Sequence, residues 1–247
     1  MADGAAAGHG VELYAHDEEL VESVAGFVAA GVAADAACVL VATPLHVAAV
    51  EDELARRDVV DPPLVLADAD ETLDRILDAG LAPEPFDAIV GELLDAAEAA
   101  APGAPRAFGE MVDLLWQRGM VDEALVVEDL WEALRRKRPF SLLCAYRVDV
   151  FDAAAQRAPL PAICNVHSHV LPAHDPARFD TAVRRALTEV LGAATTRDIY
   201  YIVDRPLRGR RVPVAQDALR WLAASFPESA GRVLDAARGY YAAVEAA

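Results

Sequence analysis

The chain has 247 residues, 55% of them hydrophobic and 25% charged, so it can bury a sizeable core without disulfides or structural metals. The formal net charge of −18 is uneven, because residues 1–152 carry 31 acidic and 10 basic side chains, whereas residues 153–247 carry 9 and 12. An acidic surface repels phosphate backbones, which argues against nucleic acid as a partner of residues 1–152.

Short apolar runs alternate with amphipathic stretches over the first 150 residues, a pattern typical of βαβ units and a mostly parallel sheet. The run at 37–42 is apolar throughout, which indicates a strand covered by helices on both faces. In chain order, the pattern predicts strands at 11–14, 37–42, 64–67, 106–110 and 140–146, and helices at 17–31, at 44–57, from 70, around 89–94, at 111–118 and at 121–136. The predicted fold class is therefore α/β.

The pattern changes after residue 150. Prolines bracket a predicted short helix at 162–171. It is followed by an amphipathic helix at 178–191, a strand at 198–203, a basic turn at 205–211 and helices at about 214–224 and 228–245. The last helix has two arginines among several acidic and aromatic residues, which suits packing or a homodimer better than a DNA groove.

Other features bear on compartment and chemistry. No apolar run reaches membrane-spanning length and the start has no secretory signal, so we expect a cytoplasmic protein without a membrane partner. Cys38, Cys144 and Cys164 lie far apart in apolar surroundings, which indicates buried reduced thiols. The single lysine, Lys137, follows no glycine-rich loop, and this excludes a Walker-type ATPase.

Polar side chains follow three of the predicted strands. Thr43 and His46 come after one strand, Asp68 after the next, and Glu110 after a third. Ligands of open parallel sheets bind at the carboxyl ends of the strands, so we expect these groups to line a pocket. Glu110 stands among apolar residues, and we expect burial to raise its pKa; the alternatives are that it caps the following helix or pairs with Arg106.

Three histidines are further candidates. His9 precedes the first strand, and His167 and His169 fall within 162–171. On a strand the last two would share a face and could bind a metal, whereas on the predicted helix they point about 200° apart. We therefore expect no metal and no other cofactor, with His167 and His169 as a weaker alternative metal pair.

The aromatic residues divide between core and pocket. Large apolar walls with a few polar groups are what a small organic ligand requires. We expect Tyr14 and Trp131 to line the ligand, Tyr146 to lie near the mouth of the pocket, and Trp116 to belong to the core.

Several segments together resemble the MEDS domain, the sensory domain of the dichloromethane-responsive regulator and its relatives. The likeness rests on His9-x-Val11-x-x-Tyr14, on the segments 39–46, 106–116, 128–134 and 140–146, and on the closing His167-Ser168-His169. It covers roughly residues 7–172. The resemblance implies a three-layer, RecA/KaiC-like α/β fold whose nucleotide loop has degenerated, and the sensing of small hydrocarbon-derived molecules in signalling or transcriptional systems.

These observations lead to a functional prediction. Residues 7–172 are predicted to form a sensory domain and residues 173–247 a mainly helical extension, with one strand or hairpin, packed on it. The domain is expected to bind a small organic ligand and to signal to a protein partner. The predicted ligand-binding residues are His9, Tyr14, Thr43, His46, Asp68, Glu110, Trp131, Tyr146 and His167. The alternative is an enzyme that uses Glu110 as general acid or base, assisted by His9 or His167.

Overall fold

A computed structural model describes residues 8–173, 175–204 and 212–243. The chain divides into two compact units. The first runs to Glu12 and continues from His16 to Arg147, and the second holds Leu13–Ala15 and everything from Val148 onward. The predicted domains, 7–172 and 173–247, follow the extent of the family resemblance, and that division stays a prediction.

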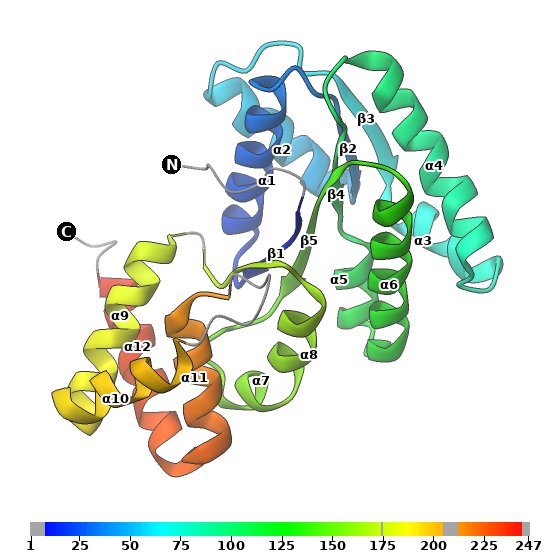
Figure 1. Ribbon diagram of the computed structural model, residues 1–247. Helices are drawn as coiled ribbons and strands as arrows, with labels where there is room; N and C mark the ends of the chain where they lie inside the picture. Colours follow the sequence, from blue (N-terminus) through cyan, green and yellow to red (C-terminus); the bar gives the residue numbers. More distant parts are fainter. Residues whose placement is uncertain (1–7, 174, 205–211, 244–247) are drawn as a thin grey trace. The chain divides into compact units, whose positions relative to one another are not determined.

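A twisted parallel sheet forms the centre of the first unit (Figure 1). Its strands are β1 (His9–Tyr14, whose end belongs to the second unit), β2 (Cys38–Ala42), β3 (Leu64–Asp68), β4 (Arg106–Gly109) and β5 (Ser141–Arg147). They lie in the order β3-β2-β4-β5-β1. β2 pairs in parallel with both β3 and β4, and β4 with β5. The prediction of an α/β fold with a mostly parallel sheet is confirmed.

Helices cover both faces of this sheet, which gives the predicted three layers. They are α1 (Asp17–Val32), α2 (Pro44–Arg56), α3 (Ala69–Asp78), α4 (Pro83–Ala100), α5 (Met111–Gln117) and α6 (Val121–Lys137). α1 packs on α2, whereas α3, α4, α5 and α6 pack on one another on the opposite face (Figure 1). The helices and strands predicted for the first 147 residues are confirmed, with ends that differ by a few residues.

The chain reverses its direction across the sheet between β2 and β4. The connection from β2 leads outward through α2 to β3, and the chain then returns over the other face to β4 and continues away to β5. Right-handed crossovers require this change of face. Neighbouring strands whose connections diverge leave a crevice at their carboxyl ends, and this is where open α/β sheets bind ligands.

The connections at that edge are short. A single residue, Thr43, separates β2 from α2, and Glu110 alone separates β4 from α5. α3 follows β3 directly. The backbone positions of Thr43 and Glu110 are therefore set by the strand and helix on either side of each residue, because a one-residue connection has little conformational freedom.

The second unit is largely helical (Figure 1). It contains α7 (Ala153–Arg157), α8 (Pro159–Val166), the short strand β6 (His169–Leu171), α9 (Pro176–Leu191), α10 (Ala193–Val203), α11 (Val214–Ser225) and α12 (Pro227–Ala243). α9 packs against α10, α11 and α12, and α7 against α11. Phe179 is fully buried, with its ring 5.6 Å from that of Phe151, so this unit has a core of its own.

The predicted strand at 198–203 is wrong, because these residues belong to helix α10. The β-branched and aromatic run Ile-Tyr-Tyr-Ile-Val favours a strand locally. The buried residues, however, are Thr196, Ile199 and Tyr200, spaced as on one face of a helix that packs against α9. Tertiary packing therefore overrides the local preference. Among the described residues after 173, all regular elements are helices. The predicted basic turn at 205–211 lies outside the described residues.

The predicted helix at 162–171 is wrong in its second half. Helix α8 ends at Val166, and a short strand, β6, begins at His169. His167 has extended backbone angles, and its Nδ1 lies 2.7 Å from the carbonyl oxygen of Ile163. A continued helix would give that carbonyl the backbone N–H of residue 167. The imidazole N–H takes the place of the backbone donor, so the helix stops.

Among the described residues, no helix combines the length and the apolar character needed to cross a membrane.

Candidate functional site

Glu110 and His46 form a buried pair where the sheet connections diverge. The Nδ1 atom of His46 lies 2.7 Å from Oε1 of Glu110, and the backbone N–H of Thr43 donates to Oε2 at 2.9 Å. Thr43 and His46 follow β2, and Glu110 follows β4. The structure thus brings together three of the predicted site residues. The Glu110 side chain does not cap α5, and the guanidinium of Arg106 stacks on Phe27 instead.

Three charged side chains surround this pair. Asp17, at the start of α1, places Oδ1 3.6 Å from Nε2 of His46 and forms an ion pair with Arg147 at the end of β5. The backbone N–H of Arg147 donates to Asp113 of α5 at 2.8 Å. Glu110 and Asp17 thus lie beside one imidazole at the carboxyl edge of the sheet, and Asp113 is close enough for its charge to act on that ring. None of Asp17, Asp113 and Arg147 was among the site residues predicted from the sequence.

The Glu110 hydrogen bond raises the pKa of His46 above its ordinary value, and the charges of Glu110 and Asp113 act in the same direction. Burial opposes the shift without cancelling it. The folded protein therefore holds the second proton of the His46 ring more tightly than the unfolded chain does. A raised histidine pKa adds stability that is fully present below the unfolded pKa, about 6.5, and is lost as the pH rises through the folded pKa.

We predict that Glu110→Gln lowers the pKa of His46, because the substitution removes the negative acceptor. The free energy of unfolding of the wild type should fall as the pH rises from below about 6.5, and this fall should be smaller in the variant. NMR titration of the His46 ring protons and denaturation at several pH values measure both effects. Asp52→Asn, an exposed carboxylate on the same helix, is the control. An unchanged His46 titration in Glu110→Gln would contradict the assignment.

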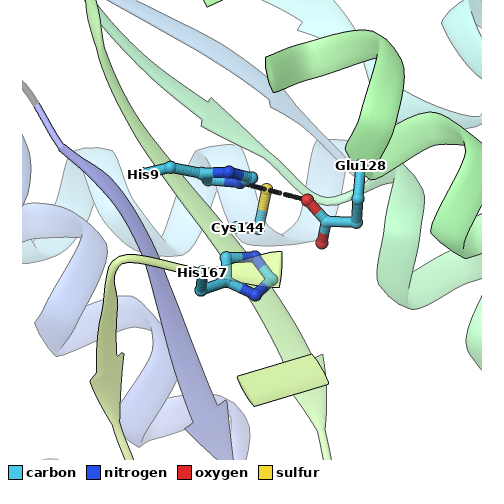
Figure 2. Close-up of side chains that lie close together, drawn as sticks. All are labelled: His9, Glu128, Cys144 and His167. Carbon is cyan, nitrogen blue, oxygen red and sulfur yellow. Dashed lines mark hydrogen bonds and ion pairs between the residues drawn. The ribbon is translucent and has the colours of Figure 1, made fainter. Parts of the chain in front are cut away.

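A second buried cluster lies within the first unit, on the face of the sheet that α6 covers. It consists of His9 on β1, Cys144 on β5 and Glu128 on α6 (Figure 2). Nε2 of His9 lies 3.1 Å from Oε2 of Glu128 and 3.4 Å from Sγ of Cys144, whose thiol donates to Glu128 at 3.3 Å. All three side chains are buried. Donor atoms of imidazole, thiol and carboxylate thus converge on one point.

Two further side chains support this cluster. The hydroxyl of Tyr146 donates to Oε1 of Glu128 at 2.8 Å, and Oε2 of Glu132 lies 3.7 Å from Nδ1 of His9. Burial and the Glu128 charge raise the pKa values of both Cys144 and Tyr146, so both are neutral in the absence of a metal. Burial raises the pKa of Glu132, but hydrogen bonding and charge from Arg135 outweigh it, so the net shift is downward.

Asp68 has a local structural partner. It is the N-cap of α3, and its Oδ1 accepts from the backbone N–H groups of Asp70 and Glu71 at 2.9 and 3.1 Å. These bonds satisfy two of the free N–H groups at the start of the helix. Its predicted role in ligand binding stays a prediction.

We predict that Asp68→Ala lowers the free energy of unfolding by about 1 kcal/mol, because the variant loses the cap of α3. Asp74→Ala, at an exposed position on the same helix, should change it by less than about 0.5 kcal/mol. Urea denaturation of the two variants gives the comparison. Equal effects in both would mean that the cap contributes nothing.

The remaining predicted site residues divide between the core of the first unit and the second unit. Trp131 is fully buried against Phe86, with ring centroids 5.2 Å apart. Tyr14 is buried at the end of β1 and belongs to the second unit. His167, also drawn in Figure 2, belongs to that unit, as does His169, whose Nδ1 lies 3.1 Å from Oγ of Ser168.

Glu128 was missed as a site residue, although the sequence contains a signal for it. It stands on the buried face of α6, beside Val127 and Trp131, where a carboxylate is costly unless it has partners. Cys144 and Tyr146 alternate along β5 and therefore share a face. An acid on an apolar helix face and a thiol two residues before a tyrosine together indicate a buried polar cluster.

Comparison with known protein families gives a match over much of the chain. The family described as MEDS, the MEthanogen/methylotroph, DcmR Sensory domain, matches residues 8–167. No curated protein and no solved structure matches the chain.

Proposed function

The chain belongs to the MEDS family of sensory domains, and from this membership and the site geometry we propose that it senses a small organic molecule at the carboxyl ends of β2 and β4. The match covers most of the chain and includes both clusters of the first unit. A sensory role is consistent with the family. The ligand and the signalling step are the proposal.

The Glu110–His46 pair carries the proposal. Glu110 uses one oxygen on Nδ1 of His46 and the other on the Thr43 N–H, so it fixes the imidazole in one orientation. Nε2 of His46 is 3.6 Å from Asp17, which is longer than a hydrogen bond. A bound hydroxyl, carbonyl or halogen can therefore accept a hydrogen bond from Nε2–H. Because the ring is fixed before the ligand arrives, little conformational entropy is lost on binding.

Signalling requires an element that responds to the ligand. Asp17 begins α1, and its carboxylate interacts with both His46 and Arg147. A ligand that accepts a hydrogen bond from Nε2 of His46 competes with Asp17 for the imidazole. Asp17 then interacts with Arg147 and no longer with His46. Arg147 is the last residue of the first unit before the chain enters the helical second unit. We propose that this exchange changes the surface offered to a protein partner.

Binding to a defined panel tests the proposal. Short-chain alcohols, aldehydes, carboxylates and halomethanes are titrated into the full chain, and binding is followed by calorimetry and by the NMR signals of His46. We expect at least one class to bind saturably without being consumed. His46→Ala and Glu110→Gln should weaken that binding by at least about tenfold, the value of one hydrogen bond to a charged group.

The control is Asp52→Asn, which leaves the His46–Glu110 pair intact and should bind like the wild type. Binding that is equally strong in His46→Ala would place the ligand elsewhere. No saturable binding of any panel class to the folded wild type would count against the proposal.

An enzyme is the second candidate, because a carboxylate 2.7 Å from a histidine is also a common acid–base pair. The histidine that contacts Glu110 is His46, whereas His9 contacts Glu128. In this reading Nε2 of His46 transfers a proton to or from the substrate and Glu110 orients the ring. Consumption of a panel compound by the wild type, abolished in His46→Ala, would favour the enzyme over the sensor.

A further inference from the structure

We propose that His9, Glu128 and Cys144 bind a zinc ion within the first unit. The three donor atoms come from β1, α6 and β5, and they lie within 4.8 Å of one another (Figure 2). Nitrogen, oxygen and thiolate sulfur are the donors that zinc takes in proteins. The site is separate from the Glu110–His46 pair and uses none of its residues.

The distances between the donor atoms fit a tetrahedral ion. Zinc bonds of about 2.0–2.2 Å to nitrogen or oxygen and about 2.3 Å to sulfur imply donor–donor distances of about 3.3–3.6 Å. The observed distances are 3.1 Å between His9 and Glu128, 3.3 Å between Cys144 and Glu128, and 3.4 Å between His9 and Cys144. All three lie within a few tenths of an ångström of a tetrahedral face. Three ligands leave one position of the tetrahedron for a further donor.

The surrounding contacts are those that orient metal ligands. A ligating histidine commonly directs its other ring nitrogen toward a carboxylate, and Nδ1 of His9 faces Glu132 at 3.7 Å. The second oxygen of Glu128 accepts from Tyr146, which leaves Oε2 turned toward His9 and Cys144. Glu132 in turn pairs with Arg135 and Arg136. The hydrogen bond from Tyr146 thus fixes Glu128 in one orientation, and the His9 ring turns Nε2 toward Glu128 and Nδ1 toward Glu132.

Binding of the ion releases one proton, that of the Cys144 thiol. The Cys144 S–H bond breaks, the sulfur electron pair forms the bond to the ion, and the proton passes to solvent. The His9–Glu128 contact is replaced by bonds from both residues to the ion. The proton that Nε2 of a neutral His9 ring shares with Glu128 moves to Nδ1, which faces Glu132, and the electron pair of Nε2 then bonds to the ion. The side chain of Glu132 is 24% exposed and lies next to His9, so the cluster is one side chain below the surface.

Metal analysis and cobalt substitution test the proposal. The full chain is purified without metal-affinity steps, and its zinc content is measured by mass spectrometry. It is then freed of metal with a chelator and titrated with cobalt(II), which reports tetrahedral coordination and thiolate ligation by absorption. We expect one equivalent of metal per chain and a thiolate-to-cobalt charge-transfer band.

Matched variants locate the ligands. Cys144→Ser should lose the charge-transfer band, and Cys38→Ser, which changes another buried thiol of the same sheet, should keep it. Glu132→Gln keeps the fold, because the side chain is partly exposed, and should weaken metal binding by about 10- to 100-fold. Glu110→Gln should leave the metal stoichiometry unchanged, so failure of the sensing proposal is distinguishable from failure of this one.

The outcomes are decisive in either direction. A wild-type protein that is folded yet holds no stoichiometric metal, and shows no charge-transfer band with cobalt, overturns the site. So does a band that survives in Cys144→Ser or disappears in Cys38→Ser. If Cys144→Ser fails to fold, the wild-type titration and the affinity of Glu132→Gln decide.

Discussion

Truncation of Trp131 to alanine is expected to lower the free energy of unfolding by about 3–5 kcal/mol, the usual cost of removing a buried tryptophan. The indole is fully buried and packs edge-on against Phe86 and Phe140, with ring centroids 5.2 and 6.2 Å away. A Cβ added at Gly109 would lie only 3.1 Å from the indole. The last residue of β4 therefore rests directly on Trp131, and the cavity left by truncation would lie beneath the turn that holds Glu110.

The control for this prediction is Val126→Ala on the same helix, because Val126 is 39% exposed and contributes little to the core. It should change the free energy of unfolding by less than about 0.5 kcal/mol. Chemical denaturation followed by circular dichroism gives both values. A loss below about 1 kcal/mol in Trp131→Ala would show that the indole is not part of the core and would support its predicted place in the ligand pocket.

The meeting of Thr43, His46 and Glu110 could be anticipated only in part. Apolar runs placed β2 and β4 correctly, and polar residues directly after them predicted a shared edge. Their contact also depends on β2 and β4 being neighbours, with β3 outside them. Strand order arises from contacts far apart in the chain, and periodicity does not encode it. The sequence therefore predicted the edge, whereas the hydrogen-bond partner of Glu110 required the structure.

Local preference failed where tertiary contacts decide the conformation. The segment 198–203 has a strand-like composition, yet its packing on α9 selects a helix. The turn at His167 depends on a single side-chain contact with the Ile163 carbonyl, which a sequence pattern does not reveal. The cluster at Glu128 was missed because its members lie far apart in the chain. His9 and Cys144, for example, are 135 residues apart.

Replacement of Glu128 by alanine is the second substitution with a large expected effect. In protein freed of metal, the hydroxyl of Tyr146 and the thiol of Cys144 both donate to this carboxylate, and His9 lies 3.1 Å from it. Alanine would leave these buried polar groups without their acceptor. Breaking a buried charged interaction from one side costs about 3–5 kcal/mol, and we expect the free energy of unfolding to fall by that amount.

Two companion variants separate charge from hydrogen bonding in this cluster. Glu128→Gln keeps an acceptor oxygen for Tyr146 but loses the negative charge beside His9. Its free energy of unfolding should therefore fall by less than that of Glu128→Ala. Asp129→Ala, the exposed neighbour on the same helix, should change the free energy of unfolding by less than about 0.5 kcal/mol. Because all measurements use metal-free protein, they report the hydrogen-bond network alone. A loss in Glu128→Ala no greater than in Asp129→Ala would mean that the buried donors find other acceptors, and that the cluster does not hold β1, β5 and α6 together.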